Sequence, residues 1–124
     1  MNDRELDIRR KRAYDTPAVS DGYRVLIDRL WPRGVPKTDA EIDEWARELA
    51  PTTELRRWFG HDPERFDEFQ RRYEAELGAH EDKLRELRRR ARKGRLTLVY
   101  GARDEAHNDA VVLCDVLRRG RSRR

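Results

Sequence analysis

Two short apolar runs limit the folds open to this chain more than any other feature. Residues 23–30 and 96–100 are both rich in β-branched and aromatic side chains, and their centres are continuously apolar. Such runs are typical of strands that are buried on both faces of a parallel sheet. Because helical patterns separate the two runs, the sequence predicts an α/β fold with a small parallel or mixed sheet of about three strands covered by helices.

The region before the first of these runs supplies the third strand, and the region after that run supplies a helix. Residues 8–14 form the expected third strand, and their basic side chains favour an edge position in the sheet. A helix is expected over about 39–50, because Thr38 and Glu41 match a capping box and apolar residues then recur at helical spacing. Pro51 should end this helix.

Helical spacing continues through most of the remaining chain. A short helix should run up to Gly60, and Asp62 followed by Pro63 is typical of a helix start. A long helix or helical hairpin should follow, with a break or kink at Gly78. Its apolar face comprises Phe66, Phe69, Tyr73, Leu77, His80, Leu84 and Leu87. The corresponding face of a last helix comprises Ala106, Ala110, Leu113, Cys114 and Leu117.

Length and composition indicate one domain. The 124 residues leave room for a domain over 1–120, followed by a basic flexible tail at 121–124. Charged residues make up 44% of the chain, yet three Trp, four Tyr and three Phe provide large apolar groups for a core. We expect a cytoplasmic protein, since no apolar run is long enough for a membrane span or signal peptide. The single cysteine, Cys114, cannot form an internal disulfide, and no Cys/His spacing predicts a zinc site.

The net charge of +4 is unevenly distributed along the chain. Residues 88–95 hold six of the 29 basic groups and residues 118–124 hold five more, and neither segment contains an acid. The rest of the chain has 18 basic groups against 25 acidic ones. Two basic segments on an acidic body could bind a nucleic acid, although solvated helix ends carry similar charges.

Charged and aromatic side chains follow both strong strands, at the point where each strand ends. The carboxyl ends of neighbouring parallel strands meet at one edge of a sheet, which is the usual ligand-binding edge of α/β proteins. Arginines at this edge can hold phosphate or carboxylate groups through paired N–H donors, and the first amides of the last helix would add donors. The residues expected to bind such a ligand are Arg29, Trp31, Arg33, Arg103 and Asn108.

Three residues of the same clusters are candidates for catalysis. Asp28 or Asp104 can act as a general base, or can bind a cation such as Mg²⁺ together with substrate phosphates. His107 can transfer protons near neutral pH. The sequence identifies no cofactor, and it contains no Gly-rich phosphate loop, metalloprotease helix motif or nucleophile elbow.

Each candidate also has an ordinary structural explanation. Asp28 can form an ion pair with a neighbouring arginine, and Trp31 can fill the core. Asp104 or Asn108 can cap the last helix, and His61 fits a turn. Two charged clusters at one sheet edge are nevertheless harder to explain by capping alone, which favours a site.

Several of these segments are similar to a known family. The resemblance lies in Asp21-Gly22, in DRLWPRG at 28–34, in WFGHDP at 58–63 and in LVYGARD at 98–104. These motifs resemble the YeaO-like family, a small bacterial family of unknown function that is also called domain of unknown function 488. The resemblance implies a single-domain α/β protein, and no established activity comes with it. The family commonly has Lys where this chain has Arg103, which keeps the cation but changes its geometry.

Two functions remain open from the sequence. The first is a small enzyme or binding protein that takes a phosphate-bearing or other anionic small molecule at the carboxyl ends of the strands. The second is a nucleic-acid-associated or protein-interaction module that uses residues 88–95 and 118–124.

Overall fold

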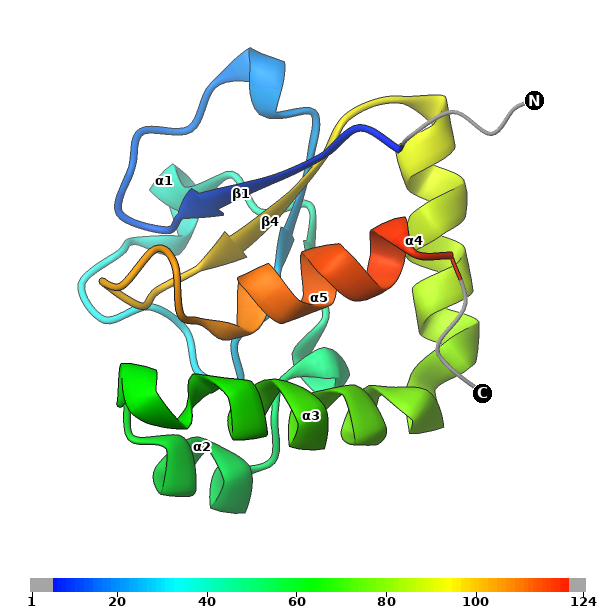
Figure 1. Cartoon of the computed structure of the whole chain (residues 1–124). Helices are drawn as coiled ribbons and strands as arrows, with labels where there is room; N and C mark the ends of the chain where they lie inside the picture. The colour runs from blue at the N-terminus through cyan, green and yellow to red at the C-terminus, as the bar shows by residue number, and fades with distance from the viewer. Residues whose placement is uncertain (1–5, 121–124) are drawn as a thin grey trace.

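A four-stranded parallel sheet forms the centre of the protein (Figure 1). The computed structural model describes residues 6–120, so the tail predicted at 121–124 lies outside the described residues. The strands are β1 (Ile8–Arg12), β2 (Tyr23–Leu26), β3 (Glu44–Trp45) and β4 (Leu96–Tyr100), in the order β1-β4-β2-β3. The predicted α/β fold is confirmed, with β1 at an edge as expected and with one strand more than expected.

The two strong strands occupy the middle of the sheet and are buried on both faces, as predicted. All five residues of β4 are buried, and β2 lies between β3 and β4. One face contributes Val25 and Leu98 to the main core. The other face carries a smaller cluster of Ala13, Leu26 and Val99, covered by Trp31, Ile42 and Trp45. Pairing along β2 ends earlier than the apolar run does, because the chain turns away after Ile27, whose amide still donates to Val99 O at 3.1 Å.

The helices in the middle of the chain begin and end close to the predicted residues. Helix α2 (Thr53–Phe59) begins after Thr52, whose Oγ1 accepts a hydrogen bond from the Leu55 amide, and it ends at Gly60. A 3-10 turn follows, with the Asp62 side chain accepting from the Glu64 amide. Each cap satisfies one of the backbone N–H groups that the first turn of a helix leaves without a partner.

The predicted break at Gly78 is confirmed. Helix α3 (Phe66–Leu77) passes through a 3-10 turn at Gly78–His80 into α4 (Glu81–Lys93), which runs in a different direction (Figure 1). The predicted apolar face is buried throughout except at His80, which is half-buried. Within residues 6–120 there is no helix that combines the length and the apolar character needed to cross a membrane.

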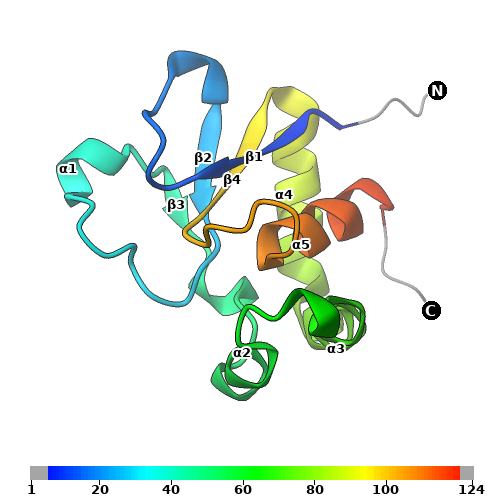
Figure 2. The same cartoon turned by 60° about the vertical axis from the view of Figure 1, so that its left-hand side comes forward.

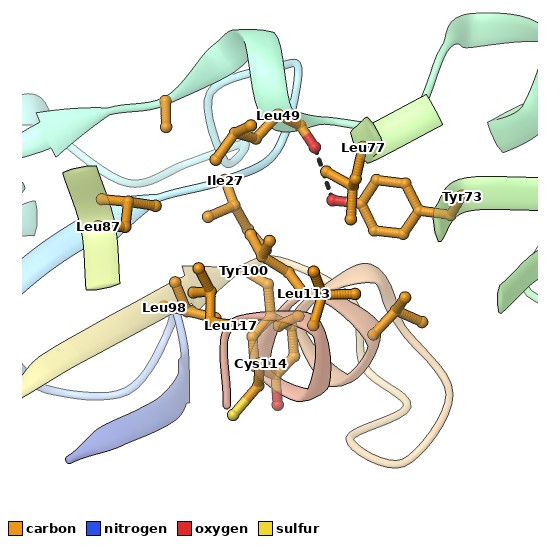
Figure 3. Close-up of a cluster of buried hydrophobic side chains, with 14 of the residues drawn as sticks. Ile27, Leu49, Tyr73, Leu77, Leu87, Leu98, Tyr100, Leu113, Cys114 and Leu117 are labelled. Carbon is orange, nitrogen blue, oxygen red and sulfur yellow. Dashed lines mark hydrogen bonds between the residues drawn. The ribbon is translucent and has the colours of Figure 1, made fainter. Parts of the chain in front are cut away.

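Helix α5 (Asp109–Arg118) packs against β1 and β4, and α3 packs against α5 (Figures 1 and 2). Residues of these layers meet in the core that Figure 3 shows, where Ile27 and Leu113 lie between the sheet and α5. The Tyr73 hydroxyl donates to Leu49 O at 2.6 Å inside this core. This bond satisfies a buried hydroxyl and ties α3 to the segment that leads from β3 to α2.

The helix predicted over 39–50 is wrong. The structure has a four-residue helix, α1 (Lys37–Ala40), then the strand β3 and a 3-10 turn at Arg47–Leu49. The expected capping box is absent from this segment, because Glu41 adopts a left-handed conformation (φ 51°) that ends α1. Long-range contacts override the helical spacing: Glu44 pairs with Lys83 of α4 and accepts from the Tyr23 hydroxyl at 2.8 Å.

Candidate functional site

A cavity of about 330 Å³ lies at the carboxyl ends of β2 and β4. Its position agrees with the general rule for ligand sites in parallel α/β sheets. The segments that line it are the loop after β2, the residues before α2, α2 with the turn that follows it, α3, the loop after β4 and the start of α5. The sixteen lining residues are Asp28, Arg29, Leu30, Trp31, Pro32, Arg33, Ala50, Pro51, Arg56, Phe59, His61, Phe69, Gly101, Ala102, Asn108 and Asp109.

The two strand-end motifs meet at this cavity. The Gly101 amide after β4 donates to Asp28 Oδ2 after β2 at 2.8 Å. Asn108 lies at the same edge and caps α5, since its Oδ1 accepts from the Val111 amide at 3.0 Å. Of the residues that the sequence nominates, the cavity is lined by Asp28, Arg29, Trp31, Arg33 and Asn108.

The other nominated residues lie outside the cavity lining. Asp104 accepts from the Ala106 and His107 amides and contacts His107 Nδ1 through its other oxygen at 2.9 Å. These bonds, with the Ala106 amide contributing most, lower the pKa of Asp104. The His107 ring meets Phe66 edge-on, and Arg103 is exposed. Asp104 and His107 therefore shape the loop before α5, whereas the helix cap itself is Asn108.

Trp31 and Trp45 hold the loop after β2 in place. Trp45 Nε1 donates to Asp28 O at 2.7 Å, and Trp31 Nε1 donates to Val35 O at 2.7 Å. The two indole rings contact each other edge to face, with centroids 5.5 Å apart. Trp31 therefore covers the second face of the sheet, as one of the sequence alternatives proposes, and also lines the cavity.

Three arginines line the cavity with much of their hydrogen-bonding capacity unused. Arg29 Nη2 donates to Pro51 O at 3.1 Å, while Arg29 Nε is buried without a hydrogen-bond partner among the described residues. Within residues 6–120, neither Arg33 nor Arg56 forms a side-chain hydrogen bond or an ion pair. A guanidinium group has five N–H donors, so these side chains can hold an anion without losing existing contacts.

Asp109 is the most important residue that sequence reasoning misses. It is the first residue of α5, and its side chain forms a hydrogen bond with Asp28. Burial raises the pKa of both carboxyl groups, and the nearby Asp28 carboxylate raises that of Asp109 further. Two buried carboxyl groups in contact resist being ionised together, so the pair keeps a shared proton to a higher pH than isolated aspartates do.

This shared proton predicts how the stability of an Asp109→Asn variant depends on pH. When folding raises the pKa of a carboxyl group, the group contributes its full stabilisation below the ordinary Asp pKa of about 3.9. This contribution is lost as the pH rises through the raised pKa of the folded state. Asparagine avoids this loss because it is neutral at every pH. The variant should therefore gain in free energy of unfolding over the wild type as the pH rises, by about 1.4 kcal/mol for each unit of raised pKa.

Urea denaturation of both proteins between about pH 4 and pH 8 measures this difference. Other carboxylates whose pKa is lowered, such as Glu44, titrate in both proteins and cancel in the comparison. A difference that stays constant or shrinks with rising pH would contradict the shared proton.

Arg56 and His61 also line the cavity without having been nominated for binding. Arg56 belongs to α2, and His61 follows Gly60 in the turn that the sequence predicts. Both lower the pKa of Asp28 electrostatically, although burial, which raises it, dominates. The motif at 58–63 marks the segment in the sequence, but no strand precedes it to suggest a site.

The basic segment 88–95 does not form one free patch. Arg88 is buried and donates to Val116 O and Leu117 O at the end of α5. Arg90 lies over the Tyr23 ring, and Arg95 pairs with Asp7. Several of these charges therefore have structural roles, and the nucleic-acid hypothesis stays a prediction. No three His, Cys, Asp or Glu side chains gather into a possible metal site in the part of the chain that the structure describes.

Comparisons with known proteins agree on one family. Residues 7–124 match the family model described as the inactive DUF488-N3 subclade. The chain is 47% identical over 113 residues to the uncharacterized protein YeaO of Escherichia coli (strain K12), covering 91% of this chain and 98% of YeaO. It is 43% identical over 115 residues to the uncharacterized protein Rv3073c of Mycobacterium tuberculosis (strain H37Rv), covering 92% of this chain and 96% of Rv3073c. No solved structure matches. The chain therefore belongs to the DUF488 family, as its resemblance to YeaO-like proteins predicts, and the family model adds that its subclade is described as inactive.

Proposed function

We propose that the protein binds a small molecule with a phosphate or other anionic group in the cavity at the carboxyl ends of β2 and β4. The observation that carries this proposal is the set of three arginines, Arg29, Arg33 and Arg56, around one cavity of about 330 Å³. Within residues 6–120, the only side-chain hydrogen bond that these three arginines make runs from Arg29 to Pro51 O. Planar guanidinium groups favour phosphate and carboxylate as partners. The cavity volume is at the small end of the usual range for sites that bind small molecules.

The proposed role is recognition without turnover. The subclade is described as inactive. Asp104 and His107, two of the three candidates for catalysis, bind each other in the loop before α5 and do not line the cavity. The third candidate, Asp28, is engaged by Gly101 and Asp109. These observations support a binding protein that leaves its ligand unchanged.

Titration with inorganic phosphate, followed by amide NMR shifts, tests this proposal. Saturable shifts are expected at Arg29, Arg33 and Gly101. Replacing Arg56 with Gln should weaken phosphate binding by about ten- to a hundredfold, because a charge-assisted hydrogen bond contributes about 1.5–3 kcal/mol.

Arg57→Gln is the matched control, since Arg57 neighbours Arg56 on α2, is exposed and does not line the cavity. It removes the same charge and should leave phosphate binding unchanged. Equal weakening by the two variants would mean that only overall charge matters. Shifts confined to α4 would move the anion site to the basic segment and refute the proposal.

A further inference from the structure

The Asp28–Asp109 pair is not explained by the binding of a bare anion. Both residues line the same cavity as the three arginines. A carboxylate repels a phosphate at close range, whereas an arginine attracts it. A single occupant that satisfies both groups therefore needs two chemically different ends, one anionic and one that donates hydrogen bonds.

The carboxyl pair is arranged to accept hydrogen bonds from a ligand. One hydrogen bond joins Asp28 to Asp109, and the Gly101 amide donates to Asp28 Oδ2. The backbone amides of Asp109 and Ala110 lower the pKa of the Asp109 carboxyl, but burial and the Asp28 carboxylate, which raise it, dominate. Because the shared proton lies between the two residues, the remaining lone pairs can only accept. A ligand that presents N–H groups would donate hydrogen bonds to these lone pairs.

The walls of the cavity favour a flat ring at this donating end. Eight of the sixteen lining residues are apolar. Among them, Phe59 and Phe69 are buried and stacked, with ring centroids 4.4 Å apart, and Trp31 is half-buried. Aromatic walls of this kind pack against planar rings through their faces and edges.

The charges of the cavity favour a dianion at the other end. Three guanidinium groups line the cavity together with only two carboxyl groups, and burial raises the pKa of both carboxyls, which favours their neutral forms. This excess of positive charge favours a phosphate monoester, which carries a charge of about −1.5 to −2 near pH 7.

We infer that the cavity takes a phosphate monoester whose other end is a flat heteroaromatic ring with adjacent N–H donors, the chemistry of a guanine nucleoside monophosphate. The ring lies against Phe59 and Phe69 and donates to Asp28 and Asp109, while the arginines hold the phosphate. This inference rests on the proposed function and adds the class of molecule that the site accepts.

Calorimetric titration with guanosine 5′-monophosphate and with ribose 5-phosphate tests it, because the two probes share the phosphate and the sugar and differ by the ring. The guanine nucleotide should bind at least about tenfold more tightly than ribose 5-phosphate. Asp109→Asn should remove most of this advantage without weakening ribose 5-phosphate, since the amide replaces an acceptor by a donor. Asp28→Asn is the second variant, and the thermal midpoint of each variant confirms that it is folded.

The outcomes separate the inference from the proposal on which it rests. Equal affinity of the two probes, with both lost in Arg56→Gln, would overturn the heteroaromatic class and support the anion site alone. A nucleotide preference that survives in both Asp variants would overturn the role of the carboxyl pair. Failure of both probes and of inorganic phosphate to bind would refute the site altogether.

Discussion

Replacing Gly22 with alanine should lower the free energy of unfolding by about 4 kcal/mol, more than any surface change. Gly22 has φ 69° and ψ −132°, a backbone conformation that residues with a Cβ rarely adopt. An added Cβ would lie 2.3 Å from Arg95 O. That carbonyl accepts from the Tyr23 amide at the start of the β2–β4 pairing, so it cannot move away without separating the two central strands.

Gly34→Ala is the matched control for this prediction. Gly34 also has a positive φ, of 80°, but apart from Gly34 and its two chain neighbours no heavy atom of the described residues comes within 4 Å of an added Cβ. It should therefore show only the conformational cost of about 1 kcal/mol. Urea denaturation of the two variants measures both losses. Similar losses would mean that the backbone conformation, rather than the clash with Arg95 O, determines the effect.

Sequence patterns predict the parts of the site that follow strands. The sequence predicts Asp28, Arg29 and Arg33 at the ligand-binding edge of the sheet, because parallel strands bring their carboxyl ends together. In the structure all three line the cavity at that edge. Arg56 was missed because its contribution depends on how α2 folds across the end of the sheet. Spacing along a helix shows which face is buried and does not show which loop that face approaches.

Asp109 was missed for a different reason. An acidic residue in the first turn of a helix is explained by the helix dipole alone, so its position in the sequence gives no signal. Its partner lies 81 positions earlier in the chain, and only the three-dimensional structure brings the two carboxyl groups together. The raised pKa values of the pair, which mark the site physically, follow from that contact.

The fold was predicted wherever local signals agreed with long-range packing, and it was missed where they conflict. Residues 39–50 have apolar residues at helical spacing. However, the backbone of Arg24 on β2 forms hydrogen bonds with Asp43 that a helix over these residues could not make. The Arg24 amide donates to Asp43 Oδ2 at 2.8 Å, and the Arg24 backbone oxygen accepts from the Asp43 amide at 2.9 Å. These bonds align the start of β3 with β2. Tertiary contacts of this kind override the weak intrinsic helix propensity of residues 39–50.

Arg24→Met should therefore destabilise the protein by about 3–5 kcal/mol, because it breaks a buried ion pair from one side. Arg24 is 3% exposed, and its Nη1 lies 2.7 Å from Asp21 Oδ2. Its other donors bond to Ala40 O and Glu41 O, which end α1. Methionine keeps most of the volume but leaves these carbonyls without their donors. The change in free energy of unfolding, measured by urea denaturation, checks the magnitude.

Hydrogen exchange distinguishes this anchoring role from a general loss of stability. In Arg24→Met, the amides of Asp43 and Ala46 should exchange faster than those at the centre of β4, since Arg24 fixes the chain that leads into β3. Arg71→Met, which removes an exposed ion pair with Glu68, should leave both stability and exchange near the wild type. Uniformly faster exchange across the sheet in Arg24→Met would show that Arg24 stabilises the whole fold and does not specifically anchor β3.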